Sequence, residues 1–258
     1  YNYIIMVSTP AYCRVLLNNS GILCELRASV RSGMIRFTYP GTGQSCLYLR
    51  VNSDEKQGSI TVSGNTITAR NPVHRIYQGR GESAGFSGWF AITFDKPFDV
   101  LHNEDGSQYM TVSFGQETNV TVSIGSSFTG AGAAMANLRA EIPAADFDIL
   151  RKETEDVWNN TLGRVKVKGG TEEDLVKFYT ALYHCYQLPR IASDVDGSYP
   201  GFAEDDRVHK AEGFDYYDDF SMWDTYRALH PLMTILEPEK TSDMVKSLIM
   251  KAEQGGWM

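Results

Sequence analysis

The feature that most constrains this chain is a change of hydrophobic periodicity near Pro143. Before that residue, apolar and polar side chains alternate in short runs, whereas after it the apolar residues recur every three or four positions. A period of two places alternate side chains on opposite faces of a strand, and a period near 3.6 lines them along one face of a helix. The chain therefore combines a β domain with a helical region, in that order.

The region 1–142 is predicted to be an antiparallel β-sandwich domain. Turn residues recur about every 10 positions, and almost no helical periodicity is present. The segment "SITVSGNTITA" predicts a hairpin that turns at Ser63-Gly64-Asn65, because glycine and asparagine tolerate positive φ. We expect the start of this domain to be missing from the chain.

Residues 143–165 are predicted to form a linking helix, with Phe147, Leu150 and Trp158 at helical spacing and Gly163 as its stop. The next helix is predicted within the segment "GGTEEDLVKFYTALYHCYQLP". Its Thr171 and Asp174 match a capping box, and Pro189 is predicted to end it.

Two more helices are predicted further on. One should extend from Phe220 to about Leu229, and the other should cover "TSDMVKSLIMKAEQ", capped by Thr241 or Ser242 and closed by Gly255-Gly256. Three or four helices with one-sided apolar stripes need partners. We therefore expect 166–258 to be the first part of a larger helical domain, completed by more of the protein or by a second chain.

Composition excludes some partners. The 258 residues carry a net charge of −8 without any cluster of Lys and Arg, so we expect no nucleic-acid partner. No apolar run approaches the roughly 20 residues that span a bilayer. The first fifteen residues lack the basic stretch that opens a signal peptide.

Cysteines and acidic residues give weak signals. Cys13 and Cys24 flank a turn and could face each other across a hairpin, but two small buried apolar residues are the favoured interpretation. Asp194 and Asp196 are predicted to stabilise a local turn, since the glutamate that closes an EF-hand loop is missing. We assign no metal ligand in this chain.

The stretch "YYDDFSMWDTYRALHP", residues 216–231, carries the most chemistry. On one continuous helix, Trp223, Tyr226 and His230 would share a face, while Asp224 and Arg227 would lie three residues apart. Asp224 and Arg227 either form a salt bridge that orients the helix or converge on one ligand. Aromatic faces beside a set of acceptors and donors are what a sugar requires.

Long segments of the chain resemble one enzyme family. "GGTEEDLVKFYTALYHCYQLPRIASDVDGSYPGF", "YYDDFSMWDTYRALHPLMTILEPEKTSDMVKSLI" and "AEQGGW" look like consecutive signatures of the family-92 glycoside hydrolases, the α-mannosidases. Upstream, "GILCELRASVRSGMIRFTYP" resembles the N-terminal sandwich of that family, and "DFDILRKETEDVWNNTLGRVKVKGGT" resembles its linker. The resemblance extends from about residue 12 to the end.

The resemblance implies a β-sandwich followed by an (α/α)6 barrel, with the active site in the cleft between them. It also implies an exo-acting, inverting, calcium-dependent α-mannosidase, in which calcium binds the mannose O2 and O3 hydroxyls. Its substrates would be α-mannosides of N-glycans or mannan, and its location secreted or periplasmic. Inversion requires two carboxyl groups about 6.5–9.5 Å apart, so that a water fits between one of them and the sugar.

Site residues follow from the matching motif. Asp224 is expected to bind a hydroxyl of the mannose, Trp223 and Arg227 to shape the subsite, and Trp257 to form a wall of the same cleft. The family's catalytic acid, catalytic base and main calcium ligands are expected beyond the end of this chain, so none is assigned here.

Two alternatives come from other classes. The chain could be a non-catalytic carbohydrate-binding or assembly module, or part of a glycoside phosphorylase of similar architecture. The segment "WDTYRALHP" favours the mannosidases over the phosphorylases.

Overall fold

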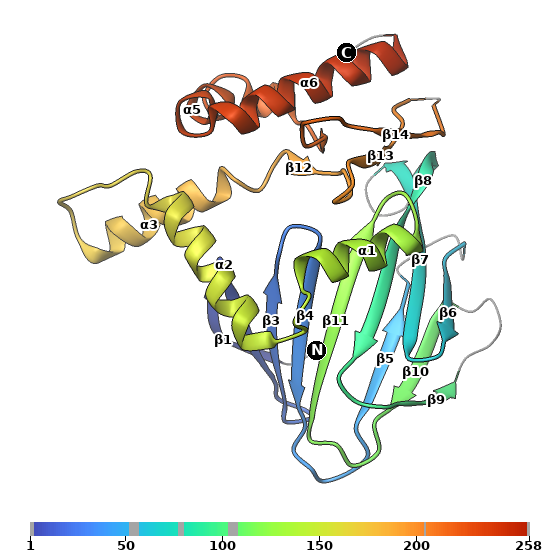
Figure 1. Cartoon of the computed structure of the whole chain (residues 1–258). Coiled ribbons are helices and arrows are strands. Elements are labelled where there is room, and N and C mark those ends of the chain that lie inside the picture. The colour runs from blue at the N-terminus through green and yellow to red at the C-terminus, as the bar shows by residue number, and fades with distance from the viewer. Residues whose placement is uncertain (1–2, 52–56, 77–79, 103–107, 204, 257–258) are drawn as a thin grey trace. The chain divides into compact units, whose positions relative to one another are not determined.

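In the computed structural model, strands β1 to β11 come before the helices (Figure 1). The structure describes residues 3–51, 57–76, 80–102, 108–203 and 205–256. These residues divide into two compact units, Tyr1–Thr154 and Glu155–Met258. The division lies inside the range 143–165 for which the sequence predicts a linking helix.

Antiparallel strands build the first unit. The larger sheet has eight strands in the order β1-β2-β3-β4-β11-β8-β7-β6, and the smaller sheet has the order β5-β10-β9. The bounds are β1 Tyr3–Thr9, β2 Tyr12–Leu17, β3 Ile22–Ala28, β4 Ser32–Thr38, β5 Cys46–Arg50, β6 Ser59–Ser63, β7 Thr66–Ile76, β8 Arg80–Phe94, β9 Asp99–His102, β10 Tyr109–Ser113 and β11 Asn119–Ser127. The predicted antiparallel sandwich is confirmed.

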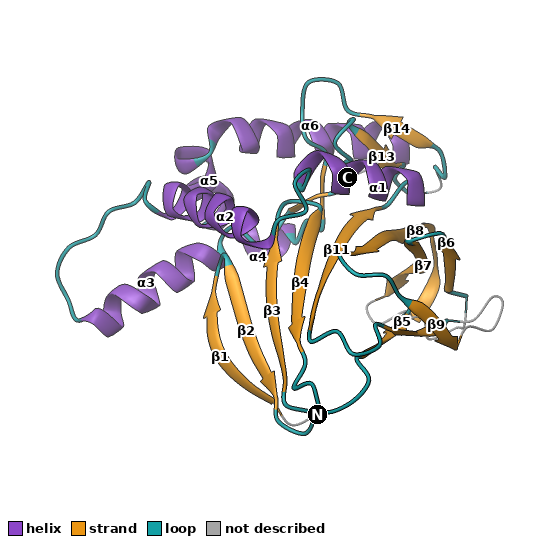
Figure 2. Ribbon diagram, turned by 60° about the horizontal axis from the view of Figure 1, so that its bottom comes forward, coloured by secondary structure: helices purple, strands orange, loops and turns teal. Residues whose placement is uncertain are grey.

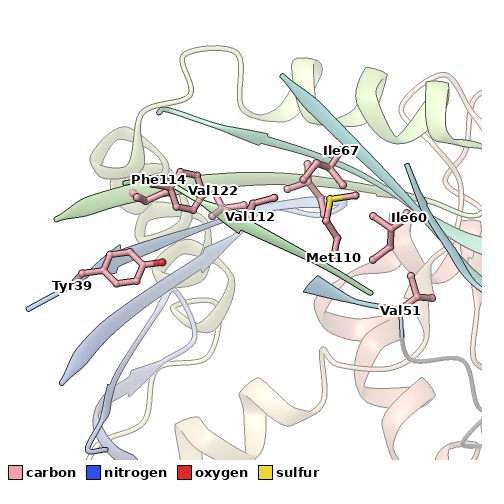
Figure 3. Packing of buried hydrophobic residues seen from close by; sticks show 11 residues of the cluster. Tyr39, Val51, Ile60, Ile67, Met110, Val112, Phe114 and Val122 are labelled. Carbon is pink, nitrogen blue, oxygen red and sulfur yellow. The ribbon is translucent and has the colours of Figure 1, made fainter. Parts of the chain in front are cut away.

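The main core lies between these two sheets, where the inward-facing side chains of alternate residues meet. Figure 3 shows part of this cluster. Its buried members are Tyr39, Val51, Ile60, Ile67, Ala69, Ile92, Met110, Val112, Phe114, Val120 and Val122. Their burial accounts for the alternating pattern in the sequence.

The predicted hairpin joins β6 to β7. Ser63 pairs with Thr66, so Gly64 and Asn65 form a two-residue loop. Gly64 has φ of 58°, in the left-handed region that favours glycine. The turn is confirmed.

Helix α1, Ala131–Glu141, was not predicted from the sequence. It packs on the larger sheet against β11, β8 and β4. Its buried residues are Ala134, Asn137 and Leu138. A Cβ atom added at Gly125 of β11 would overlap the carbonyl oxygen of Ala134 and lie 2.7 Å from Cβ of Leu138, so this close approach requires glycine.

Helix α2, Phe147–Leu162, ends just before Gly163, as predicted. Its first turns belong to the first unit, where Phe147 and Leu150 pack with Met34 in a second apolar cluster. The buried guanidinium of Arg27 donates a 3.0 Å hydrogen bond to the carbonyl oxygen of Phe147. The start of α2 is thereby fixed to β3.

The second unit has helices and short strand pairs (Figure 2). Tyr199 and Tyr216 stack at 3.8 Å in its core with Ala192 and Ala211, and Phe214 and Met250 pack against them. The elements of the second unit after α2 are α3 Glu172–His184, β12 Arg190–Ile191, β13 Ser198–Pro200, β14 Val208–Lys210, β15 Tyr217–Asp218, α4 Met222–Thr225, α5 Leu229–Leu236 and α6 Pro238–Gly255.

The capping box at the start of α3 is confirmed. The Thr171 side chain accepts from the Asp174 backbone N–H, and the Asp174 side chain accepts from the Thr171 backbone N–H. The predicted end at Pro189 is wrong, because α3 stops at His184 and a turn follows.

The helix predicted from Phe220 to about Leu229 is also wrong. Helix α4 ends at Thr225, and α5 starts at Leu229 and contains Pro231 in its first turn. In one continuous helix, Pro231 would lack the N–H that bonds to the Arg227 carbonyl, and its ring would clash there. The break at 226–228 places the proline where no such bond is needed.

The last helix, α6, begins earlier than predicted, with Pro238 in its first turn instead of a cap at Thr241 or Ser242. Its end is confirmed, since Gly256 has φ of 73° and closes the helix in the left-handed conformation.

All four cysteines are free. Strand β2 pairs with β3 so that Cys13 lies opposite Leu26 and Cys24 opposite Val15. The two cysteines are therefore not direct cross-strand partners, and Cys24 is a buried core residue.

Candidate functional site

Asp224 lies in the short helix α4, where Ser221 holds its carboxylate. The hydroxyl of Ser221 donates to Oδ2 of Asp224 at 2.5 Å, and the backbone N–H of Asp224 donates to the Ser221 carbonyl at 3.0 Å. Oδ1 of Asp224 has no hydrogen-bond partner among the residues described. One acceptor of the carboxylate is thus fixed, and the other is available to a ligand.

Arg227 has a different partner. Its Nη2 donates to the Tyr226 hydroxyl at 2.8 Å, and its guanidinium carbon lies 5.5 Å from the centre of the Tyr226 ring. The salt bridge with Asp224 that the sequence suggested as one interpretation is not formed. Because α4 ends at Thr225, the two side chains do not share a helix face.

The aromatic residues of this segment are open to solvent. The Trp223 side chain is 85% exposed and that of Tyr226 is 49% exposed. The exposed Trp223 indole can therefore meet a ligand. Trp257, the fourth predicted site residue, lies outside the described residues.

His230 is placed on the next helix. Its imidazole lies 6.4 Å from the Phe220 ring, and its Nε2 atom is buried without a hydrogen-bond partner among the described residues. Burial lowers the pKa of His230 below its usual value, so the ring is neutral at pH 7. The predicted common face of Trp223, Tyr226 and His230 is interrupted between the two helices.

Ser221 is the residue that the sequence prediction missed. The spacing Ser-x-x-Asp at 221–224 is a signal that could have identified it, because this pattern brings the two side chains together at a helix start. Here the serine hydroxyl donates to the carboxylate instead of accepting from the backbone.

The acidic loop behaves as a turn, as predicted. The Gly197 N–H donates to the Asp194 carbonyl at 2.9 Å, and the Ser198 N–H donates to Oδ1 of Asp196 at 3.0 Å. The backbone N–H and the hydroxyl of Ser198 both donate to the Asp196 carboxylate and lower its pKa. Among the described residues, no group of three or more His, Cys, Asp or Glu side chains could hold a metal ion.

Comparison with protein families identifies the chain. Residues 6–134 match the glycosyl hydrolase family 92 N-terminal domain, and residues 133–258 match the glycosyl hydrolase family 92 catalytic domain. The chain belongs to glycosyl hydrolase family 92. The predicted membership is confirmed, and the helices after the sandwich belong to the family's catalytic domain.

Solved structures of the family have the same fold. A family 92 α-mannosidase from Bacteroides thetaiotaomicron is 28% identical, with a TM-score of 0.82 over 96% of this chain. A family 92 inverting mannosidase from the same organism is 26% identical, with a TM-score of 0.83 over 98% of this chain. The chain spans 36% of the length of each.

Two other comparisons cover less of this chain or share less of its sequence. An uncharacterised secreted glycosidase of Arthroderma benhamiae is 28% identical over 144 residues, which are 53% of this chain and 17% of the relative. A protein from the human microbiome whose name likens it to the kojibiose phosphorylases shares the fold alone, at 14% identity and a TM-score of 0.53. None of the described helices is long and apolar enough to cross a membrane.

Proposed function

We propose that this chain is part of an exo-acting, inverting α-mannosidase that hydrolyses terminal α-mannose from N-glycans or mannans. The observation that carries this proposal is the open Oδ1 atom of Asp224, which follows the exposed Trp223 in the same short helix. A carboxylate accepts hydrogen bonds from sugar hydroxyls, and an aromatic face packs on the C–H surface of a pyranose. A family 92 α-mannosidase solved with mannoimidazole supports the choice of sugar.

Each residue has a proposed role. Asp224 accepts a hydroxyl of the terminal mannose, and Trp223 packs against the ring. Arg227 has further N–H donors beyond the one used on Tyr226, so it can donate to sugar oxygens. Trp257 is proposed as a further wall of this site.

The chemical step requires groups that we do not assign in this chain. An inverting glycosidase uses a carboxylic acid to protonate the leaving oxygen and a carboxylate, about 6.5–9.5 Å away, to activate water. The role of this chain is to bind and orient the sugar. Binding energy of this kind accelerates the reaction only where it is stronger in the transition state than in the ground state.

Calcium is proposed as the cofactor of the complete enzyme. Among the described residues, no three His, Cys, Asp or Glu side chains come together, so no carboxylate cluster for calcium is formed there. Calcium prefers six to eight oxygen ligands, and we propose that these come mainly from other parts of the enzyme.

The remainder of the catalytic domain is the proposed partner, since the chain spans little more than a third of the solved relatives. A secreted or periplasmic location is also proposed, supported by the name of the Arthroderma benhamiae relative. The linkage that is cleaved is not part of the proposal.

The test is an assay of the full-length protein that contains this chain. α-Linked mannobiose and yeast mannan would be supplied, and proton NMR would follow the anomeric signal of the released mannose. Early appearance of β-mannose is the expected result, because inversion converts the α linkage to the β anomer. Binding of mannan without release would indicate the alternative, a non-catalytic carbohydrate-binding module. Early appearance of α-mannose would contradict inversion.

A further inference from the structure

A second hollow in the Glu155–Met258 unit has features of a ligand site. Its volume is about 460 Å³, and it is lined by Trp158, Tyr186, Gln187, Leu188 and Arg190. We call it the Trp158 pocket. Small-molecule sites occupy roughly 300–1,000 Å³ and combine apolar walls with a few placed polar groups.

The aromatic walls of the Trp158 pocket are held by neighbouring rings. Trp158 contacts Tyr183 edge to face at 4.9 Å and Tyr186 at 6.3 Å with an interplanar angle of 90°. The Tyr186 hydroxyl donates to Oε1 of Glu237 at 3.4 Å, and Arg164 forms an ion pair with the same carboxylate. These contacts fix the ring positions before any ligand binds.

The polar groups of the Trp158 pocket suit an uncharged ligand. Nε of Arg190 donates to Oδ2 of Asp219 at 2.8 Å, so the charge of the guanidinium is balanced within the protein. Its remaining donors extend the hydrogen-bonding capacity of the pocket. The Gln187 side-chain amide, which offers one acceptor and two donors, has no protein partner in the described part of the chain.

The pairing of β12 with β15 links the Trp158 pocket to the segment that carries Asp224. Arg190 of β12 pairs with Asp218 of β15, and Asp219 follows directly. Asp219 has φ of 62°, which residues other than glycine rarely adopt, and its ion pair with Arg190 supports this conformation. Ser221 and Asp224 come next in the chain. One arginine therefore both lines the pocket and fixes the segment that carries Asp224.

We infer that the Trp158 pocket binds a second, neutral hexopyranose unit of the same oligomannoside whose terminal mannose contacts Asp224. This inference rests on the proposed function. A hexopyranose has a C–H face for the indole and phenol rings and hydroxyls for the amide and guanidinium. A hexopyranose carries no charge, which agrees with a pocket in which the Asp219 carboxylate already balances the charge of the Arg190 guanidinium.

The inference is tested on the full-length enzyme with two variants, Trp158→Phe and Gln187→Ala. The readouts are kcat/KM for p-nitrophenyl α-mannoside, which offers one sugar, and for α-mannotriose, which offers three. Calorimetry with a thio-linked α-mannotriose, which resists hydrolysis, measures binding without chemistry. Lys177→Gln on the exposed side of α3 serves as the matched control.

We expect each variant to lower kcat/KM for α-mannotriose and affinity for the thio-linked analogue by about tenfold, as expected for one lost contact. Values for p-nitrophenyl α-mannoside should remain unchanged. Equal losses on both substrates, or no loss on either, would overturn the inference while leaving the proposed function intact. The enzyme could release no mannose and still bind the analogue, with lower affinity in the Trp158 and Gln187 variants. That result would overturn the proposed function but support the Trp158 pocket as a sugar site. Absence of binding to the analogue would overturn the pocket itself.

Discussion

The hydroxyl of Ser221 donates a hydrogen bond to Oδ2 of Asp224, the carboxylate that we propose binds mannose. The serine orients the acid from three residues earlier in the chain and leaves Oδ1 open. The nearest basic residue in sequence, Arg227, bonds to Tyr226 instead. Asp224 is therefore positioned by a neutral hydroxyl group.

Replacing Asp224 with alanine should lower kcat/KM of the full-length enzyme by about 10²- to 10³-fold, or about 3–4 kcal/mol of transition-state binding. Ser221→Ala should lower it less, because the acid remains. The thermal midpoint of unfolding should be unchanged in both variants, since α4 has no buried residues. Loss of folding in Asp224→Ala would instead indicate a structural role.

Replacing Trp223 with alanine should raise KM for mannosides, because the aromatic face is lost. The side chain is 85% exposed, so the free energy of unfolding should change by less than about 0.5 kcal/mol. Steady-state kinetics and urea unfolding on the same sample check both effects. Ile235→Ala, a similarly exposed apolar residue on α5, is the control and should leave KM unchanged.

Two glycines of the first unit should respond in opposite directions to alanine. Gly125→Ala should destabilise the protein by about 1–3 kcal/mol, because the new methyl group collides with α1. Gly132→Ala, within α1, meets nothing within 4 Å and should stabilise by a few tenths to about 1 kcal/mol. Chemical unfolding of the full chain measures both changes. A neutral Gly125→Ala variant would contradict the tight fit of α1.

The same fit explains why the sequence did not predict α1. The segment "AGAAMANLRAE" buries small residues against the sheet, so it lacks the wide apolar stripe by which an amphipathic helix is recognised. The strands and the long helices were predictable because their periodicity reflects burial on one face. The capping box at Thr171 was predictable because it depends on residues three apart.

For part of the candidate site, the sequence predicted which residues belong to it but not how their side chains are arranged. Family resemblance selected Trp223, Asp224 and Arg227, but a continuous helix was predicted from Phe220 to about Leu229. The break between α4 and α5 then changed the partners of Asp224 and Arg227. The Trp158 pocket depends on contacts between segments far apart in the sequence, and no local pattern encodes those.

Acid should weaken the first unit through Glu25. Burial raises the pKa of this carboxyl, but hydrogen bonds from Arg36 and Tyr12 outweigh it and leave the pKa below its usual value. Such a group stabilises the folded state above the pKa of the unfolded chain, near 4.3, and this stabilisation is lost as pH falls through the lowered folded pKa. Urea unfolding of the wild type and Glu25→Gln between pH 7 and pH 3 should show a weaker acid dependence in the variant. Parallel curves would contradict this role of Glu25.

Chelation should abolish mannose release by the full-length enzyme if calcium is its cofactor, and added Ca²⁺ should restore it. No three His, Cys, Asp or Glu side chains come together in the described part of the chain, so EDTA should leave the near-ultraviolet circular dichroism of this chain alone unchanged. Activity that survives exhaustive dialysis against EDTA would remove calcium from the proposal.

The two family domains meet at residues 133–134, within α1, although α1 packs on the sheet of the first unit. Recombination between two relatives at that junction would combine β11 of one relative with most of α1 from the other. The residue at position 125 and the helix that covers it would then no longer be matched in size. Exchange of segments should therefore be tolerated better when α1 travels with the strands that it covers. The segment that must be exchanged as a whole to preserve packing therefore extends past the boundary between the two family domains, to the end of α1.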